Sequence, residues 1–193
     1  MQPKSSAILD FWFGPPTDPT HTQSSPQWFR KDATFDAEIA RRFGPLIDEA
    51  LSGGLQDWTA TPTGTLALIL VLDQFTRNTG RDTPRAFAGD PRALSLAKSL
   101  VASGADRTLT GVQRQFVYLP FEHSESLADQ DESIRLFAQL GRDEPALAGL
   151  LEWAERHRVI VARFGRFPHR NAALGRTNTA EEAGFLMQPG SGF

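Results

Sequence analysis

Residues 62–78, PTGTLALILVLDQFTRN, decide the fold class of this chain. The run from Leu66 to Leu72 is apolar on every side, so periodicity alone does not separate a buried helix from a buried strand. Thr61 and Pro62 favour a helix, because threonine is a good N-cap and proline is well tolerated at the first helical position. Leucine, alanine and glutamine favour it too. We therefore predict a buried helix here, with an apolar run too short to cross a bilayer.

The rest of the chain carries frequent helix boundaries and few strand signals. Apolar residues recur at helical spacing over 33–52, where Pro45 is expected to kink or split the helix. Capping boxes at Thr110 and Thr179 each predict a helix start, and the first of these helices meets Pro120. The other predicted helices cover 5–13, 91–103, 127–140 and 144–164, and 14–27 is predicted to be a loop. We therefore expect an all-α fold, an irregular array of about eight or nine helices in antiparallel pairs.

Length and composition narrow the class of protein. At 193 residues the chain fits one domain, 1–193, with 40% hydrophobic and 22% charged residues. It contains no cysteine, which excludes disulfides, thiolate metal sites and a cysteine nucleophile. The net charge of −3 gives no reason to expect nucleic-acid binding. We expect a soluble cytoplasmic protein with no membrane contact, and a homodimer is a possible assembly.

Polar side chains follow the apolar run at the end of 62–78. Asp73 and Arg77 are four residues apart and can pair on one helix face, with Asn78 next to them. Because the helix is buried, this polar end can line a cavity and contribute to a binding site. The alternative is a helix C-terminus that simply becomes polar, with Arg77 near the negative end of the helix dipole.

A second polar place is the stretch RQFVYLPFEHSE, which begins at Arg114. Arg114 and Tyr118 share a helix face and are candidate ligand-binding residues. Glu122, His123 and Glu125 are candidate general acids or bases, or metal ligands. The metal alternative is the weaker one, because the sequence has no Glu-x-x-His pair and no His-Glu-x-x-His motif. We predict no metal, and prefer a carboxylate cluster that neutralises arginines elsewhere.

The third place has six arginines and no acid between residues 156 and 176. Arginine at fixed loop positions suits bidentate binding of carboxylate or phosphate. The candidate ligand-binding residues here are Arg163, Arg166, His169, Arg170 and Asn171. Two alternatives remain, a salt-bridged network with the acidic stretch 122–132 and a solvated surface.

The stretches LDQFTRN, RQFVYLPFEHSE and RFGRFPHRNAALGR together resemble the bacterial family catalogued as domain of unknown function 924. The likeness runs from LDFWFG near the N-terminus to EEAGFL, with Thr76 where the family pattern has proline. The resemblance implies an all-α fold related to tetratricopeptide-like helical repeats. It supplies no activity, and we expect no cofactor.

Three hypotheses about function follow. The first is a binding module whose arginines line one pocket for a small anionic metabolite or a peptide carboxylate. The second is a metal-independent hydrolase or lyase with Glu122 or His123 as base. The third is a buried ionic network that specifies the fold and has a purely structural role. We interpret His157 separately, as a core histidine, because it is surrounded by apolar residues on its helix.

Overall fold

The computed structural model describes residues 4–21 and 23–192, and this part of the chain contains helices, turns and bends but no strand. The all-α prediction is therefore confirmed, while the likeness to tetratricopeptide repeats stays a prediction. The α-helices are α1 (Lys4–Phe13), α2 (Ala33–Leu51), α3 (Pro62–Ile69), α4 (Thr76–Thr79), α5 (Asp90–Ser103), α6 (Gly111–Glu122), α7 (Leu127–Asp143), α8 (Leu150–Phe164) and α9 (Ala180–Leu186). No helix in the described ranges has the length and apolarity that crossing a membrane requires.

Helix α3 lies at the centre of the molecule and continues through a π-helix, Leu70–Phe75, into α4. Thr61 caps α3 by accepting a hydrogen bond from the Gly64 amide at 3.1 Å, as its position before Pro62 predicts. Every residue from Gly64 to Thr76 is buried. The predicted buried helix is confirmed, but its wider π-helical turn was not foreseen. Such turns are rare in proteins overall, and many of those that occur lie at functional sites.

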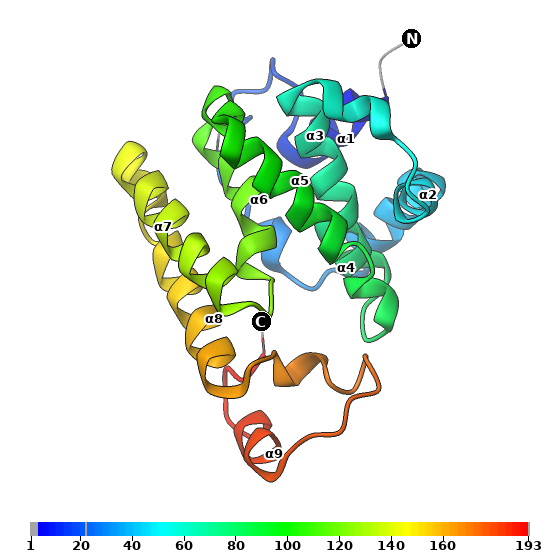
Figure 1. The fold of residues 1–193 in the computed structure, drawn as a ribbon. Helices are drawn as coiled ribbons and strands as arrows, with labels where there is room; N and C mark the ends of the chain where they lie inside the picture. Colours follow the sequence, from blue (N-terminus) through cyan, green and yellow to red (C-terminus); the bar gives the residue numbers. More distant parts are fainter. Residues whose placement is uncertain (1–3, 22, 193) are drawn as a thin grey trace.

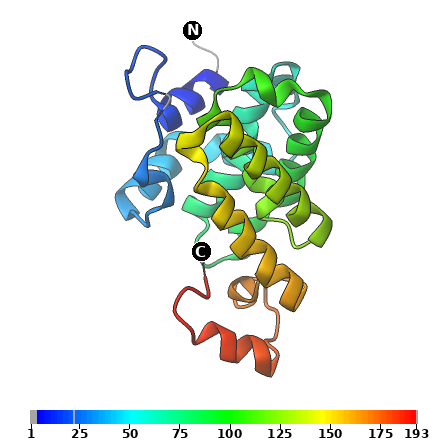
Figure 2. The same ribbon diagram turned by 90° about the vertical axis from the view of Figure 1, so that its left-hand side faces the viewer.

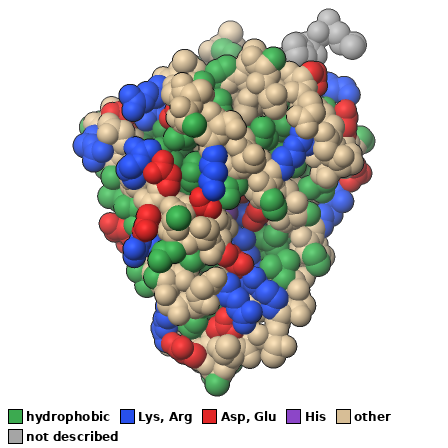
Figure 3. Space-filling view, viewed as in Figure 1, with side chains coloured by type: hydrophobic (Ala, Val, Ile, Leu, Met, Phe, Trp, Pro, Cys, Tyr) green, Lys and Arg blue, Asp and Glu red, His purple; other side chains and the backbone are tan. Residues whose placement is uncertain are grey.

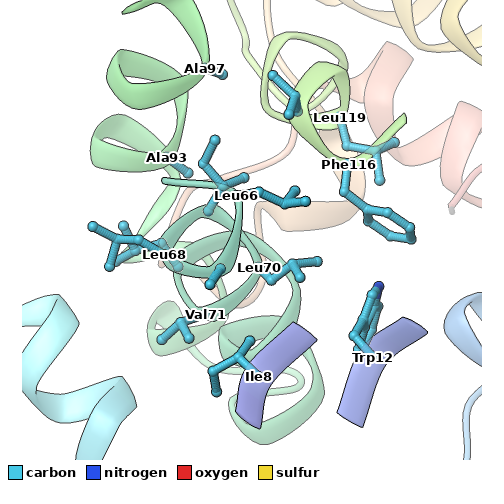
Figure 4. Close-up of a cluster of buried hydrophobic side chains, with 14 of the residues drawn as sticks. Ile8, Trp12, Leu66, Leu68, Leu70, Val71, Ala93, Ala97, Phe116 and Leu119 are labelled. Atoms are coloured by element: carbon cyan, nitrogen blue, oxygen red, sulfur yellow. The ribbon is translucent and has the colours of Figure 1, made fainter. Parts of the chain in front are cut away.

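The main hydrophobic core surrounds α3. Helices α1, α5 and α6 contact α3, and α2 packs against the π-helix (Figure 1). Figure 4 shows Leu66, Leu68 and Leu70 of this central segment pointing toward side chains of the neighbouring helices. Those neighbours include Ile8, Trp12, Ala93, Ala97, Phe116 and Leu119, all of them buried. The core thus fixes the polar residues that follow the apolar run.

Helices α6, α7 and α8 pack in chain order, with α7 and α8 antiparallel along one side of the molecule (Figures 1 and 2). The chain then turns through the 3₁₀ helix Pro168–Arg170 and reaches α9 at one end of the molecule (Figure 2). A small separate cluster of Ile160, Val161 and Phe167 packs this C-terminal segment against α8. Through Arg170 the segment reaches Phe87 and Asp90 at the start of α5.

Some predicted boundaries were wrong. Helix α2 is not split at Pro45. The proline is exposed, so water can bind the Arg41 carbonyl that it leaves without a helical donor. Helix α7 passes Gly141 and ends at Asp143. The predicted helix over 144–164 begins instead as a separate 3₁₀ turn, Pro145–Leu147.

Candidate functional site

The π-helix places Asp73 at the bottom of a polar cluster, with only 1% of the residue exposed. Its carboxylate accepts hydrogen bonds from Gln74 Nε2 at 2.5 Å and from Arg77 at 3.0 Å. Burial alone would raise the pKa of Asp73, but the positive charge of Arg77 and the hydrogen bond from His123 bring it well below the ordinary value. Asp73 is therefore an ionised, buried carboxylate.

His123, at the end of α6, is oriented by Asp73. Its Nδ1 lies 2.7 Å from Asp73 Oδ1. Because the carboxylate only accepts, Nδ1 carries the proton, and the lone pair of the neutral ring lies on Nε2. Burial, followed by the charge of Arg77, lowers the pKa of His123. The pair is an oriented imidazole of the kind that serves as a base or as a metal ligand.

Two arginines meet above this pair on the carboxylate of Asp90, the first residue of α5. Arg77 binds both Asp90 oxygens, at 2.9 and 3.0 Å, and Arg170 binds one of them at 3.1 Å. The Arg170 guanidinium lies over the rings of both Phe87 and Phe167, 4.7 and 4.6 Å from their centroids. Burial and the charge of Arg77 lower the pKa of Arg170 to about 10, so it stays charged at neutral pH.

Arg170 keeps one unused donor. Its other terminal nitrogen donates to the His123 carbonyl at 2.9 Å, but its Nε has no hydrogen-bond partner within residues 4–21 and 23–192. Only 6% of the residue is exposed, so bulk water does not solvate this group as it would a surface arginine. A buried N–H without an acceptor is uncommon in folded proteins and calls for an explanation.

Glu122 and His157 form the other side of the cluster. Glu122 Oε1 lies 3.2 Å from His157 Nδ1, and no arginine in the described ranges pairs with this carboxyl group. Burial and the charge of Asp73 raise the pKa of Glu122 to about 8. Burial and the neighbouring His123 lower the pKa of His157 to about 3. One donor atom from each of Glu122, His123 and His157 lies within 4.8 Å of the other two, so these three residues could hold a metal ion.

A second layer fixes the loop that carries Arg170. Glu125 accepts from the Phe167 amide at 2.8 Å and binds Arg176 through both of its oxygens at 2.7 and 2.9 Å. Arg176 also donates to Asn171 at 2.8 Å. Burial would raise the pKa of Glu125, but the hydrogen bonds from Arg176 lower it. His169 lies on the same loop, where burial and the charge of Arg170 lower its pKa to about 4.

We call the residues Asp73, Arg77, Asp90, Glu122, His123, His157 and Arg170 the central cluster. It reaches the surface at the side chains of Arg77, Asp90 and His123, which are 21%, 19% and 14% exposed. Figure 3 shows histidine surface in the middle of this face, with basic and acidic side chains around it. The cluster is thus buried at its base and open at one edge, which we call its mouth.

The remaining predicted site residues lie elsewhere. Arg114 and Tyr118 bond to one another at 3.0 Å and to Asp143 and Asp106, between α6 and α7. Arg163 pairs at the surface with Glu181 of α9, and Arg166 pairs with Glu182, a buried residue of the same helix. Asn78 donates to Asp36 of α2 at 2.6 Å. The structure therefore does not bring the candidate arginines into one pocket, and only Arg77 and Arg170 converge.

Two members of the central cluster were missed by sequence reasoning. Asp90 directly precedes the predicted helix 91–103, and an acid at that position is ordinary. His157 was interpreted as a core histidine because its helical neighbours are apolar. Its burial was foreseen correctly, but its position beside Glu122 and His123 comes from the packing of α8 against α6. No sequence signal reports that contact.

The chain belongs to the family described as "Bacterial protein of unknown function (DUF924)", whose sequence model matches residues 8–190. It is also similar to the solved structure of a protein of unknown function, ATU0120, from Agrobacterium tumefaciens. The two share 39% identity over 94% of this chain and 96% of that one, with a TM-score of 0.82. No curated protein matches the sequence. The resemblance drawn from the three motifs is confirmed.

Proposed function

We propose that the protein binds a small molecule through a carboxylate or phosphate group at the mouth of the central cluster. The observation that carries this proposal is the buried Nε of Arg170, which has no acceptor in the described ranges. Leaving a buried donor unpaired costs about 1–3 kcal/mol, and more for a charged group. A ligand oxygen that reached this buried nitrogen from the mouth would remove that cost, which favours a ligand with an anionic oxygen.

The arrangement of Arg77 and Arg170 supports the same proposal. Both guanidinium groups already hold one carboxylate, that of Asp90, in a forked geometry. The rings of Phe87 and Phe167 fix the plane of the Arg170 guanidinium. Because the donors are ordered before binding, little side-chain entropy is lost when a second planar anion joins them. A small metabolite or the carboxylate end of a peptide fits this chemistry, and we keep the cytoplasm as the proposed location.

Catalysis is a second candidate, favoured by one observation. Glu122 lies within the cluster without an arginine partner in the described ranges, and it is accompanied by the oriented ring of His123. The hydrolase or lyase hypothesis needs such a group beside arginines that can stabilise negative charge. Catalysis of this kind also depends on the mouth binding an anion, which the following measurement tests.

The test is a thermal-shift measurement with inorganic phosphate and with a panel of phosphorylated and carboxylated metabolites. We expect at least one compound to raise the melting temperature of the wild-type protein, as binding to the folded state requires. In Arg170→Lys, which keeps the charge but lacks Nε, we expect that shift to be lost. The matched control is Arg163→Lys, on the exposed ion pair with Glu181, which should respond as the wild type does. A wild type that responds to none of the anions would refute the proposal, as would Arg170→Lys responding normally.

A further inference from the structure

Beyond anion binding, we propose that Glu122, His123 and His157 form a binding site for a divalent transition-metal ion. One donor atom from each side chain lies within 4.8 Å of the other two. The residues come from two helices that pack together, α6 with its C-cap and α8. Glu122 is 3% exposed and His157 5%, so the donors face one another and are shielded from bulk water.

The donor set suits a metal of the zinc type. Two imidazoles and one carboxylate are the ligands of many catalytic zinc sites, which leave a fourth position open for water or substrate. Metal–ligand bonds of about 2.0–2.2 Å place tetrahedral ligand atoms about 3.4 Å apart. The three donor atoms lie within 4.8 Å of one another, so closing the site requires them to draw together by about 1.4 Å at most. Magnesium and calcium, which prefer oxygen ligands, fit it poorly.

Both histidines are oriented by a hydrogen bond from the ring atom Nδ1. His123 Nδ1 donates to Asp73 at 2.7 Å, and His157 Nδ1 lies 2.8 Å from the Trp153 carbonyl. Ligating histidines typically donate their second ring nitrogen to a carboxylate or a backbone carbonyl in this way. Asp73 is itself fixed by Arg77 and Gln74 on the π-helix. A histidine with only a packing role does not need this carboxylate, whereas a metal ligand gains orientation from it.

Charge and access also permit a cation. The positive charges of Arg77 and Arg170 are matched by the two carboxylates that they bind, Asp73 and Asp90. The cation therefore meets no net positive charge from these four groups, and it gains the carboxylate of Glu122. Entry is possible from the mouth, where 14% of the His123 side chain is exposed.

The experiment titrates the chelator-treated, full-length protein with Co²⁺ alone, followed by its visible ligand-field spectrum, and with Zn²⁺ alone by calorimetry. We expect one ion per chain for each metal and no response to Mg²⁺. Glu122→Gln, His123→Gln and His157→Gln should each weaken binding by more than about 100-fold, and Asp73→Asn by about 10- to 100-fold. His21→Gln is the matched control, because His21 lies outside the central cluster and bonds to the Gly14 carbonyl near the N-terminus.

A measurement on the wild type guards against variants that fail to fold. With ¹⁵N-labelled imidazoles, Zn²⁺ should shift the ring resonances of His123 and His157 strongly and leave those of His21 unchanged. No stoichiometric binding to the wild type would overturn the proposal, and so would binding that only His21→Gln removes. These titrations contain no phosphate or carboxylate ligand, so they test the metal site separately from the proposed function. A protein that binds Zn²⁺ but neither phosphate nor any carboxylate would refute only the proposed anion binding. A protein that binds such an anion but no Zn²⁺ would refute only the metal site.

Discussion

Two buried arginine clusters in this protein contain similar residue types, but they differ in how fully their polar groups are paired. In the Arg114 cluster, Arg114 bonds to Tyr118 and Asp143, and Tyr118 donates to Asp106 at 2.6 Å. None of these four side chains leaves a buried polar atom without a hydrogen-bond partner in the described ranges. The central cluster leaves Arg170 Nε without an acceptor and Glu122 without an arginine. It also gathers His123 and His157, with His169 close by.

The difference separates a structural network from a candidate site. A polar network whose members satisfy one another has no chemical capacity left for a ligand, and its removal is felt as lost stability. A network with an unused donor, oriented imidazoles and an open edge keeps that capacity. Residue type alone did not distinguish the two, since both were predicted as parts of one pocket.

The largest expected effect is on stability at the Arg114 cluster. Arg114→Ala removes a partner from the buried Tyr118–Asp106 pair, so we expect unfolding to become easier by about 3 kcal/mol. Asp143 is 38% exposed, so water can solvate its carboxylate once Arg114 is gone. The expected loss therefore lies near the lower end of the range for buried ion pairs. Chemical denaturation followed by circular dichroism measures this change in the free energy of unfolding. Binding of anion or metal by the folded fraction should be unchanged. A variant that folds but does not bind would contradict the assignment of the Arg114 cluster to structure and the central cluster to binding.

A smaller stability effect is expected at the central cluster. Arg170→Lys keeps a cation beside Asp90 but loses the planar contacts with Phe87 and Phe167, for which we expect a loss of about 1 kcal/mol. The same denaturation experiment measures it. If Arg170→Lys proves as costly as Arg114→Ala, the central cluster is a structural network and the comparison between the two clusters fails.

The smallest expected effect is on the ionisation of Tyr118, which reports directly on the Arg114 cluster. Burial and the hydrogen bond to Asp106 raise the pKa of Tyr118 to about 12. Because the chain has a single tyrosine, the ultraviolet absorbance of tyrosinate follows this group alone. The folded protein holds the phenol proton between pH 10 and 12 while the unfolded chain releases it, so stability should fall as pH rises through that range. We expect Asp106→Asn to lower the pKa of Tyr118. If the phenol of the folded wild type ionised near pH 10, the Arg114 cluster would not be a network whose members satisfy one another.

Local chemistry explains which features were predictable. Helix starts followed from caps at Thr61, Thr110 and Thr179, and each of them is present. Asp73, Arg77, His123 and Arg170 were found because polar residues beside buried segments stand out. Asp90 lies 80 residues from its partner Arg170 in sequence, and Glu122 meets His157 across two helices. Such contacts depend on how helices pack, which spacing in one sequence does not encode.

The π-helix at Leu70–Phe75 has a consequence for how this chain tolerates change. One extra residue in a turn shifts the phase of everything that follows by about 100° relative to an ordinary helix. The two halves of the central helix are therefore set independently, with the apolar half facing the core and Arg77 facing Asp90. A single-residue deletion between Leu70 and Phe75 would remove the extra residue, so the turn could close to an ordinary α-helix with Arg77 still directed toward Asp90. Closing the wide turn without a deletion would instead rotate Arg77 by about 100°, away from its carboxylate. The wide turn thus lets this segment carry one more residue while both of its halves keep their contacts.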